Sequence, residues 1–382
     1  MTVLRILAAV PLAGWVFLAL LRGMYWRTDI RLPAGADPAV WPPVAIVMPA
    51  RNEAAVLPQS LPTLTSQAYQ GPVSVILVDD NSTDGTSRLV SERWPHVVVV
   101  DPGEPAVGWA GKLWALRAGV RAAESAGADI TYFLFTDADI AHLPDSLAML
   151  VRAAEAGRLD VVSQMARLRA HTGWERLVVP AFVYFFALLY PFRWSNKPGA
   201  HTAAAAGGCS LVRRTALDRA GGLDTIRGAV IDDVALAKAI KRTGGRTFLG
   251  LADRVESIRP YPHLADLWHM VARSAYAQLR RSPLLLAGTV IGLGLMFWLP
   301  PICVIVGAAS GDVPTLLLGA VAYAVMCALF VPMLRYYRLS PALAVALPFT
   351  ATLYLGMTVD SAVQHYRGNG AAWKGRTYAA EA

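Results

Sequence analysis

Long apolar runs occupy both ends of the chain, whereas the middle alternates short apolar runs with polar clusters. The run Val3–Met24 is interrupted by charge only at Arg5 and Arg22, and it matches the roughly 20 residues needed to cross a bilayer. No A-x-A-like cleavage site follows Leu21. The pattern therefore favours an uncleaved anchor over a signal peptide.

Three more apolar runs predict a C-terminal membrane domain, namely Leu284–Ala309, Leu316–Leu334 and Leu343–Val359. Basic residues follow the N-terminal run, and the loop Ser310–Pro314 has none, so the positive-inside rule places the middle of the chain in the cytosol. Three C-terminal crossings would leave a basic tail outside, against this rule, so a re-entrant or interfacial segment is the alternative to a full crossing by the last run. A further run, Leu177–Phe192, is predicted as an interfacial helix, with a core helix as the alternative.

Between the apolar ends, short β-branched runs end in polar clusters and alternate with helical patterns. The predicted strands are Val44–Met48, Val73–Val78, Val97–Val100 and Tyr132–Phe135. Strands that alternate with helices indicate an α/β fold with a mostly parallel sheet. Ligands of such sheets bind beyond the carboxyl ends of the strands, so the polar clusters there are the candidate sites.

Two of these clusters predict nucleotide binding. The first contributes Pro49, Ala50, Arg51 and Glu53, and the second contributes Asp79 and Asp80. Carboxylates at strand ends can accept hydrogen bonds from a nucleobase and a ribose. Turn formation and helix capping explain the following run Ser82–Thr86, but they do not explain two adjacent acids.

A third cluster, Thr136-Asp137-Ala138-Asp139, predicts a metal site. In an extended segment Asp137 and Asp139 point to the same face, where they repel unless a cation lies between them. Few oxygen ligands and open positions for a diphosphate suit Mg²⁺ or Mn²⁺, which would act as a Lewis acid on the departing group.

Three other features are candidates with a structural alternative beside each. Lys112 opens a helical pattern and could reach a phosphate, or it lies on a solvated helix face. The small residues before and including Gly207, Gly208 and Cys209 could admit an acceptor, or they pack helices tightly. Of Asp232 and Asp233, one could be an N-cap, and the other could act as a general base on an acceptor hydroxyl.

Composition narrows the class of protein. The chain has 382 residues, 55% of them hydrophobic, with a mean hydropathy of +0.41, and its formal charge is +8. The basic residues are scattered and several flank apolar runs, so we expect a membrane partner and no nucleic acid. The three cysteines show no paired spacing, which favours a reducing compartment.

Together the motifs resemble family 2 glycosyltransferases, which have the GT-A nucleotide-diphospho-sugar transferase fold and invert the anomeric centre. The resemblance implies that Pro49–Glu53, Asp79, Asp80, Lys112 and Asp137 bind the nucleotide-sugar, and that Asp137 and Asp139 hold Mg²⁺ or Mn²⁺. Asp233 then matches the catalytic base of the family's E-D pair, with Asp232 in place of Glu.

The C-terminal part adds a resemblance to lipid-modifying members of that family. Gln278-Leu279-Arg280-Arg281-Ser282 looks like the Q-x-x-R-W motif of processive and ceramide-type enzymes, with Ser282 in place of Trp, which implies donor contacts for Gln278 and Arg281. Trp373–Tyr378 looks like the W-K-G-R-x-Y ending of lipid-modifying relatives. Several longer stretches look like hopene-associated glycosyltransferases of bacterial hopanoid clusters.

These observations predict a membrane-bound glycosyltransferase of the bacterial inner membrane, with a cytosolic catalytic domain. The expected parts are an anchor at 1–26, the GT-A domain at 40–262, an interfacial helix at 263–283, a membrane domain at 284–364 and a basic tail at 365–382. The expected donor is a UDP-sugar, and the expected acceptor is a hopanoid or another polyisoprenoid-derived lipid. The alternatives are a processive polysaccharide synthase, and a transporter or scramblase with a nucleotide-sensing domain.

Overall fold

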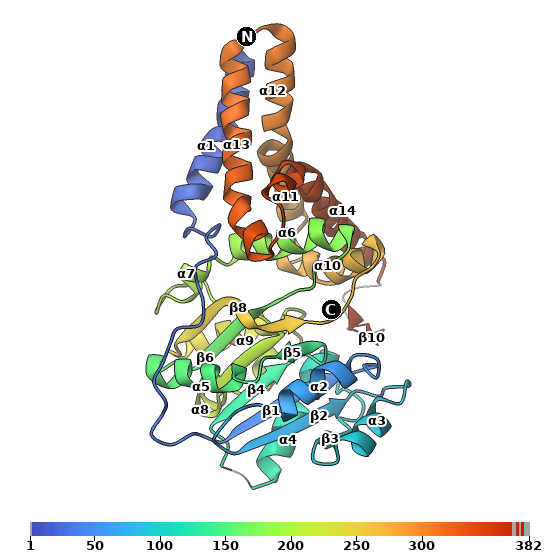
Figure 1. Ribbon diagram of the computed structural model, residues 1–382. Coiled ribbons are helices and arrows are strands. Elements are labelled where there is room, and N and C mark those ends of the chain that lie inside the picture. Colours follow the sequence, from blue (N-terminus) through green and yellow to red (C-terminus); the bar gives the residue numbers. More distant parts are fainter. Residues whose placement is uncertain (1, 128, 369–371, 374–375, 378–382) are drawn as a thin grey trace. The chain divides into compact units, whose positions relative to one another are not determined.

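A computed structural model describes residues 2–127, 129–368, 372–373 and 376–377, and it divides the chain into two compact units (Figure 1). The helical unit comprises Met1–Asp29, Ala170–Arg193 and Tyr261–Asn369. The sheet unit comprises Ile30–Arg169, Trp194–Pro260 and Gly370–Ala382. Each unit is therefore assembled from separate stretches of sequence.

In the part of the chain that the structure describes, the main sheet of the sheet unit has eight strands in the order β3-β2-β1-β4-β7-β6-β8-β5. The strands are β1 (Val44–Ala50), β2 (Val73–Asp79), β3 (Val98–Val100), β4 (Tyr132–Thr136), β5 (Ile140–His142), β6 (Val161–Arg167), β7 (Cys209–Arg213) and β8 (Thr247–Ser257). Strands β3, β2, β1 and β4 are parallel neighbours, as are β6 and β8, whereas β7 is antiparallel to β4 and β6, and β5 to β8. The sheet is thus mixed, with a parallel half that contains the four strands predicted from the sequence.

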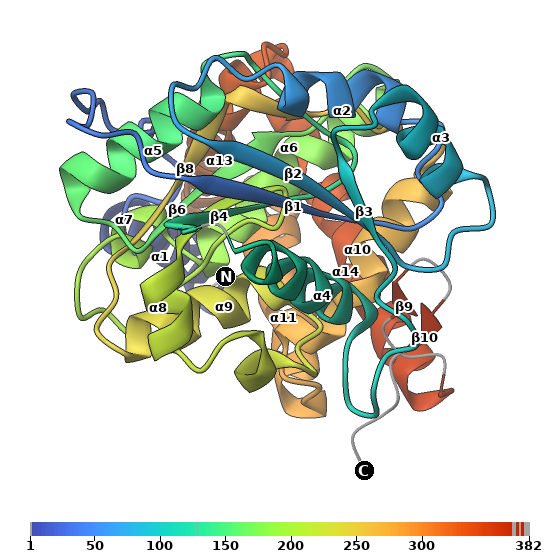
Figure 2. The same ribbon diagram turned by 90° about the horizontal axis from the view of Figure 1, so that it is seen from below.

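Helices cover both faces of this sheet. Those of the sheet unit are α2 (Leu57–Thr65), α3 (Thr86–Arg93), α4 (Gly111–Ser125), α5 (Ser146–Gly157), α8 (Arg214–Arg219) and α9 (Asp232–Arg242), with a 3₁₀ turn, η1 (Leu223–Ile226). Figure 2 shows α2, α3 and α5 on one face and α4, α8 and α9 on the other. Successive side chains of β1 point to opposite faces of the sheet. Ile46 therefore packs in the hydrophobic core under α2, α3 and α5, and Val47 packs in the core under α4, α8 and α9.

Among the described residues, the helical unit contains four helical segments that are long and apolar enough to cross a membrane, judged by length and composition. They are Thr2–Leu21, Pro283–Ser310, Val313–Tyr336 and Pro341–Tyr366. The first segment is α1, and the third is α13 (Val313–Tyr336). The second consists of α11 (Pro283–Leu293), the π-turn η2 (Gly294–Trp298) and α12 (Leu299–Ser310). The fourth consists of the 3₁₀ helix η3 (Pro341–Ala346) and α14 (Leu347–Tyr366). All four predicted runs are therefore helical, and the last is also long enough to span by length and composition.

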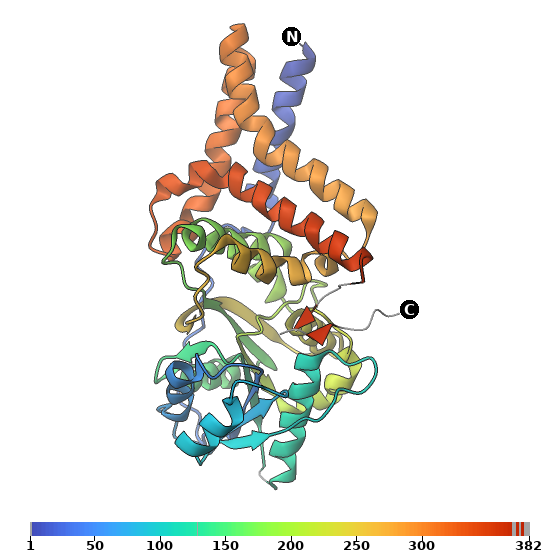
Figure 3. The same ribbon diagram turned by 90° about the vertical axis from the view of Figure 1, so that its right-hand side faces the viewer.

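Specific polar contacts join α1 to the C-terminal helices. The α1, α12 and α13 helices run side by side (Figure 3). Arg5 donates to the carboxylate of Asp312, which is buried before α13. Farther along α1, the Trp15 indole donates to the Met296 carbonyl at 2.8 Å, within the π-turn that interrupts the regular helical bonding. The N-terminal helix is thus an integral part of the helical unit.

The apolar run in the middle of the chain forms α6 (Gly173–Leu189), which belongs to the helical unit. A capping box between Thr172 and Glu175 fixes its start, and Glu175 also accepts a hydrogen bond from the Tyr261 N–H, just before α10 (Leu264–Gln278). It packs against α10, α13 and α14, and Val178, Val179 and Tyr184 are fully buried. It is not among the helices long enough to span. The short α7 (Phe192–Ser195) follows it.

The predicted W-K-G-R-x-Y ending falls only partly within the described residues. Ala372–Trp373 (β9) and Arg376–Thr377 (β10) pair as antiparallel strands. Lys374, Gly375 and Tyr378 lie outside the described residues.

Candidate active site

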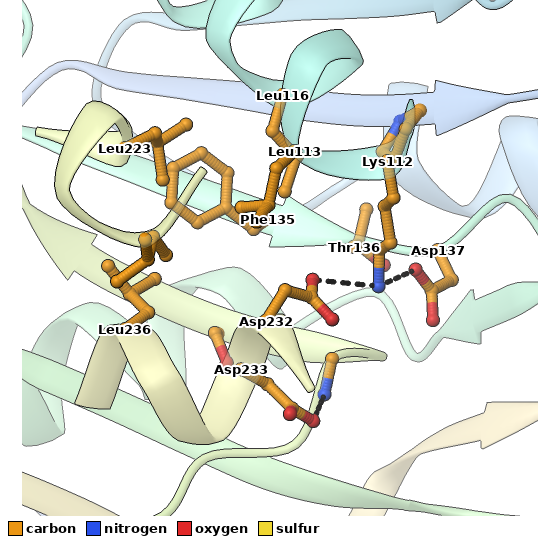
Figure 4. A pocket seen from close by; sticks show the side chains of 14 residues that line it. Lys112, Leu113, Leu116, Phe135, Thr136, Asp137, Leu223, Asp232, Asp233 and Leu236 are labelled. Atoms are coloured by element: carbon orange, nitrogen blue, oxygen red, sulfur yellow. Dashed lines mark hydrogen bonds and ion pairs between the residues drawn. The ribbon is translucent and has the colours of Figure 1, made fainter. Parts of the chain in front are cut away.

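A pocket at the carboxyl end of β4 brings together residues that are far apart in the sequence (Figure 4). Its polar side is made by Lys112, Asp137, Asp232 and Asp233, and its apolar side by Leu113, Leu116, Phe135, Leu223 and Leu236. Three local structures position the polar groups, because α4 begins one residue before Lys112, β4 ends one residue before Asp137, and α9 begins with the two acids. Four residues from three separately predicted motifs therefore share one pocket.

Lys112 bridges two of the acids. Its ammonium Nζ lies 2.8 Å from Asp137 Oδ1 and 3.3 Å from Asp232 Oδ2, and only 14% of its side chain is exposed. Burial alone would lower the pKa of Lys112, but Asp137 and Asp232 raise the pKa above its ordinary value, so the ammonium stays charged. Lys112 is thus a buried cation and does not lie on a solvated helix face.

Asp233 is held by backbone donors. Its Oδ2 accepts from the Gly207 N–H and its Oδ1 from the Val234 N–H, both at 2.7 Å. Burial, reinforced by the charge of Asp232, raises the pKa of Asp233 to about 7. The N-cap alternative for this acid pair is wrong, because the cap position is Ile231 and no side chain caps the helix there.

Asp139 faces a different set of partners from Asp137. Residues 138–139 form a turn, so the extended geometry expected for the D-x-D motif is wrong. The Asp139 carboxylate accepts from Ser257 at 2.9 Å and from the Arg259 Nε at 3.1 Å, and Arg259 also binds both oxygens of Glu53. Sequence reasoning gave Arg259 no role. The available signal was its place two residues beyond the end of β8.

Asp137 and Asp139 fit a divalent cation by the chemistry of their oxygen donors. Hard cations such as Mg²⁺ and Mn²⁺ prefer carboxylate oxygens and take further ligands from water and phosphates. Asp137 presents the more open carboxylate, with 36% of its side chain exposed. Within the part of the chain that the structure describes, no group of three or more His, Cys, Asp or Glu side chains could hold a metal. Asp137 and Asp139 therefore offer two oxygen ligands, and any further ligands of such a cation would have to come from water or a bound molecule.

The predicted nucleotide-binding acids are already engaged within the protein. Asp79 accepts from the hydroxyls of Ser82 and Ser87, and Asp80 is fully buried. Arg51 donates to the Asp80 carbonyl at 2.6 Å, and its guanidinium lies 3.5 Å from the Asp80 carboxylate. In this structure Asp80 thus orients Arg51 and the end of β1, whereas Pro49 lines the pocket directly.

Of the remaining predicted site residues, only Gly207 lines this pocket among the described residues. Gly207 lies in the pocket, whereas Gly208 packs toward Ile140 and Cys209 is fully buried at the start of β7. Burial raises the pKa of the Cys209 thiol to about 12, so it is not a reactive thiolate. Gln278 and Arg281 belong to the helical unit, where Tyr190 donates to the Gln278 amide oxygen and Tyr276 to the Arg281 carbonyl.

Comparison with known proteins supports the resemblance to glycosyltransferases. Residues 45–221 match the family model described as Glycosyl transferase family 2. The chain is 34% identical over 154 residues to an undecaprenyl-phosphate 4-deoxy-4-formamido-L-arabinose transferase of Aeromonas hydrophila subsp. hydrophila. It is 30% identical over 135 residues to a polyprenol monophosphomannose synthase of Mycolicibacterium smegmatis. These matches cover 37% and 32% of the chain, and 39% and 46% of the two relatives, so the chain spans less than half the length of either.

A solved structure extends the likeness of fold to almost the whole chain. The mannosyltransferase PcManGT of Pyrobaculum calidifontis, in complex with GDP-Man and Mn²⁺, matches with a TM-score of 0.57 at 22% identity. The match covers 95% of this chain and 99% of that one. The fold of the sheet unit is the GT-A fold, as the sequence motifs predicted.

Proposed function

We propose, from the premise that residues 45–221 form a glycosyl transferase family 2 domain, that the protein transfers a sugar from a nucleotide-diphospho-sugar to a membrane lipid with inversion at the anomeric carbon. The observation that carries the proposal is the convergence of Lys112, Asp137, Asp232 and Asp233 in one pocket at the end of β4. Such a site can neutralise a leaving diphosphate at one point and accept a proton at another.

The donor is assigned to the strand ends of the parallel half of the sheet. Arg51, Glu53, Asp79 and Asp80 would hold the nucleoside end, with the buried Asp80 acting through Arg51. Lys112 would pair with the diphosphate, since its ammonium is charged and sits at the pocket. Asp137 and Asp139 would hold Mg²⁺ or Mn²⁺, which when bound supplies Lewis-acid stabilisation of the leaving diphosphate.

Asp233 is the proposed general base. With a pKa raised to about 7, it is partly ionised at neutral pH, which is the range where a base both exists and attracts a proton. The Gly207 and Val234 N–H groups fix the orientation of its carboxylate. Asp232 holds Lys112 and keeps the pKa of Asp233 high, so it acts as a positioning residue.

Two acceptor oxygens are consistent with this machinery. The relatives from A. hydrophila and M. smegmatis are named for polyprenyl phosphates, which supports a lipid phosphate. The second pKa of a phosphate monoester is about 6, so at pH 7 its oxygen is mostly ionised and needs little help from a base to attack. A hydroxyl acceptor, such as that of a hopanoid, does need one, and the Asp233 carboxylate, which lines the pocket and is held by two N–H groups, supports such an acceptor. We propose the hydroxyl acceptor and treat the lipid phosphate as the second candidate.

The proposed location is the bacterial inner membrane, with the sheet unit in the cytosol. Four apolar helical segments support membrane insertion, and the basic residues Arg22, Arg27 and Arg31 after α1 support the orientation. That Gln278 and Arg281 bind the donor remains a prediction from the sequence. The domain boundaries predicted from the sequence, with the catalytic domain at 40–262 and the membrane domain at 284–364, remain part of the proposal.

The experiment is transfer by the full-length protein in lipid nanodiscs. UDP- and GDP-sugars are supplied with Mn²⁺ or Mg²⁺ and with either a polyprenyl phosphate or a hopanoid bearing a hydroxyl, and products are identified by mass spectrometry. We expect one donor and the hydroxyl lipid to give a glycolipid with inverted configuration by NMR. Product only from the polyprenyl phosphate selects the second candidate, and polymeric product selects a processive synthase. No turnover with any pair favours the transporter or scramblase alternative.

A further inference from the structure

The ammonium of Lys112 fills the space where the carboxylates of the pocket converge. It lies within 3.3 Å of both Asp137 and Asp232, and it is bordered by the backbone of Gly207. A Cβ at position 207 would lie 2.9 Å from Lys112 Nζ, 3.5 Å from Asp233 Oδ2 and 3.8 Å from Asp137 Oδ2. The absent side chain of Gly207 therefore leaves room for a cation among three acids, and a side chain of the protein supplies that cation.

Both carboxylates of the D-x-D motif are paired in the same way. Asp137 binds Lys112, and Asp139 binds Arg259. These are the carboxylates to which the proposed function assigns the divalent cation. An ammonium with 14% exposure is poorly screened by solvent, so it opposes the entry of a second positive charge at Asp137.

Lys112 is also suited to leave the acids when a better anion arrives. Its charge sits at the end of a flexible four-carbon stem, unlike the planar fork of an arginine. Lys112 lies in the first turn of α4, the end of a helix that favours anions. A nucleoside diphosphate at the pocket would therefore offer the ammonium a new partner, and the carboxylate of Asp137 would become available.

We propose that Lys112 is a resident counter-ion that keeps the affinity of the empty pocket for Mg²⁺ or Mn²⁺ low and transfers to the diphosphate when the donor binds. Metal binding then depends on the nucleotide, and by linkage nucleotide binding depends equally on the metal. The inference rests on the proposed function, because it takes the donor to be a nucleotide-diphospho-sugar. It adds an order of assembly, in which the divalent cation enters with the donor and not before it.

The test is a titration of full-length protein with Mn²⁺, in which electron paramagnetic resonance reports the free ion. For the wild type we expect GDP or UDP to tighten Mn²⁺ binding by at least about tenfold, beyond the Mn²⁺ bound by the nucleotide alone. Lys112→Met should tighten binding without nucleotide by at least about tenfold and reduce the coupling toward one. Lys112→Arg keeps the charge and should keep weak binding without nucleotide. Lys197→Met, at an exposed lysine outside the pocket, is the matched control.

The wild-type measurement stands even if Lys112→Met fails to fold. Equal Mn²⁺ affinity with and without nucleotide in the wild type overturns the proposal, as does equal or weaker affinity in a folded Lys112→Met protein without nucleotide. A failure of the proposed function looks different. In that case no donor supports transfer to any lipid, whatever the coupling between Mn²⁺ and nucleotide. Active transfer together with tight Mn²⁺ binding in the absence of nucleotide overturns only the role of Lys112.

Discussion

The two adjacent acid pairs, Asp79–Asp80 and Asp232–Asp233, look alike in sequence but have different surroundings. Asp79 is satisfied by serine hydroxyls, and Asp80 is fully buried beside Arg51. In the second pair, Asp232 binds the ammonium of Lys112, and Asp233 is held by two N–H groups at the pocket with a pKa raised to about 7. The two pairs therefore differ in their partners: the first is held by side chains around the end of β2, whereas the second lies at the pocket, where the proposed function makes Asp233 the general base.

The largest effect should come from Asp233→Asn. The amide keeps the shape of the side chain but cannot take a proton, so transfer to a hydroxyl acceptor should fall by about 10²- to 10⁴-fold. Binding of the nucleoside diphosphate, measured by calorimetry, should change little. A fall of only a few-fold would show that the acceptor ionises without help, as a lipid phosphate does.

The matching change in the other pair, Asp80→Asn, should lower the stability of the protein in addition to any effect on donor binding through Arg51. Loss of the charge weakens a buried contact with Arg51, so we expect the free energy of unfolding to fall by about 1–3 kcal/mol. The thermal unfolding midpoint in detergent, followed by circular dichroism, checks this. Asp253→Asn is the control, because the Asp253 side chain is 62% exposed. An unchanged midpoint for Asp80→Asn would remove the distinction between the two pairs.

The pH dependence of transfer should report the ionisation of Asp233. A base with pKa about 7 must be ionised to act, so kcat/KM should drop by about tenfold between pH 8 and pH 6. Burial is the first cause of the raised pKa of Asp233 and the charge of Asp232 the second. Asp232→Asn should therefore move the acid limb to lower pH. A limb that stays in place would mean that another group titrates.

The smallest effect is expected for Gly207→Ala. The added Cβ would lie 2.9 Å from Lys112 Nζ, but the end of a lysine can move by a few tenths of an ångström. We expect transfer to fall by a few-fold, on the order of 1 kcal/mol, with little change in the unfolding midpoint. Gly173→Ala is the control, because no atom lies within 4 Å of its added Cβ. A loss as large as that of Asp233→Asn would indicate that Gly207 contacts the acceptor itself.

Sequence reasoning located elements better than it located partners. The four parallel strands were predictable because each is an apolar run that ends in a polar cluster, and the spans because each is long and apolar. The pairing of Asp139 with Arg259 was not predictable, because the two residues are 120 positions apart. The turn at residues 138–139 likewise replaces the extended segment that would have aligned Asp137 with Asp139. Side-chain direction at a strand end depends on contacts from distant elements, which periodicity does not contain.

The most direct test of the account is lipid glycosylation by the full-length wild type and by Asp137→Asn in nanodiscs, under the same donor, acceptor and Mn²⁺ concentrations. Asp137 binds Lys112 and is a proposed ligand of the divalent cation. The two positive charges proposed to stabilise the donor diphosphate, the Lys112 ammonium and the cation, therefore both depend on Asp137. We expect the wild type to form the glycolipid and Asp137→Asn to form it at least about 100-fold more slowly. Formation at the wild-type rate by Asp137→Asn, or no glycolipid from the wild type with any donor, would contradict the account.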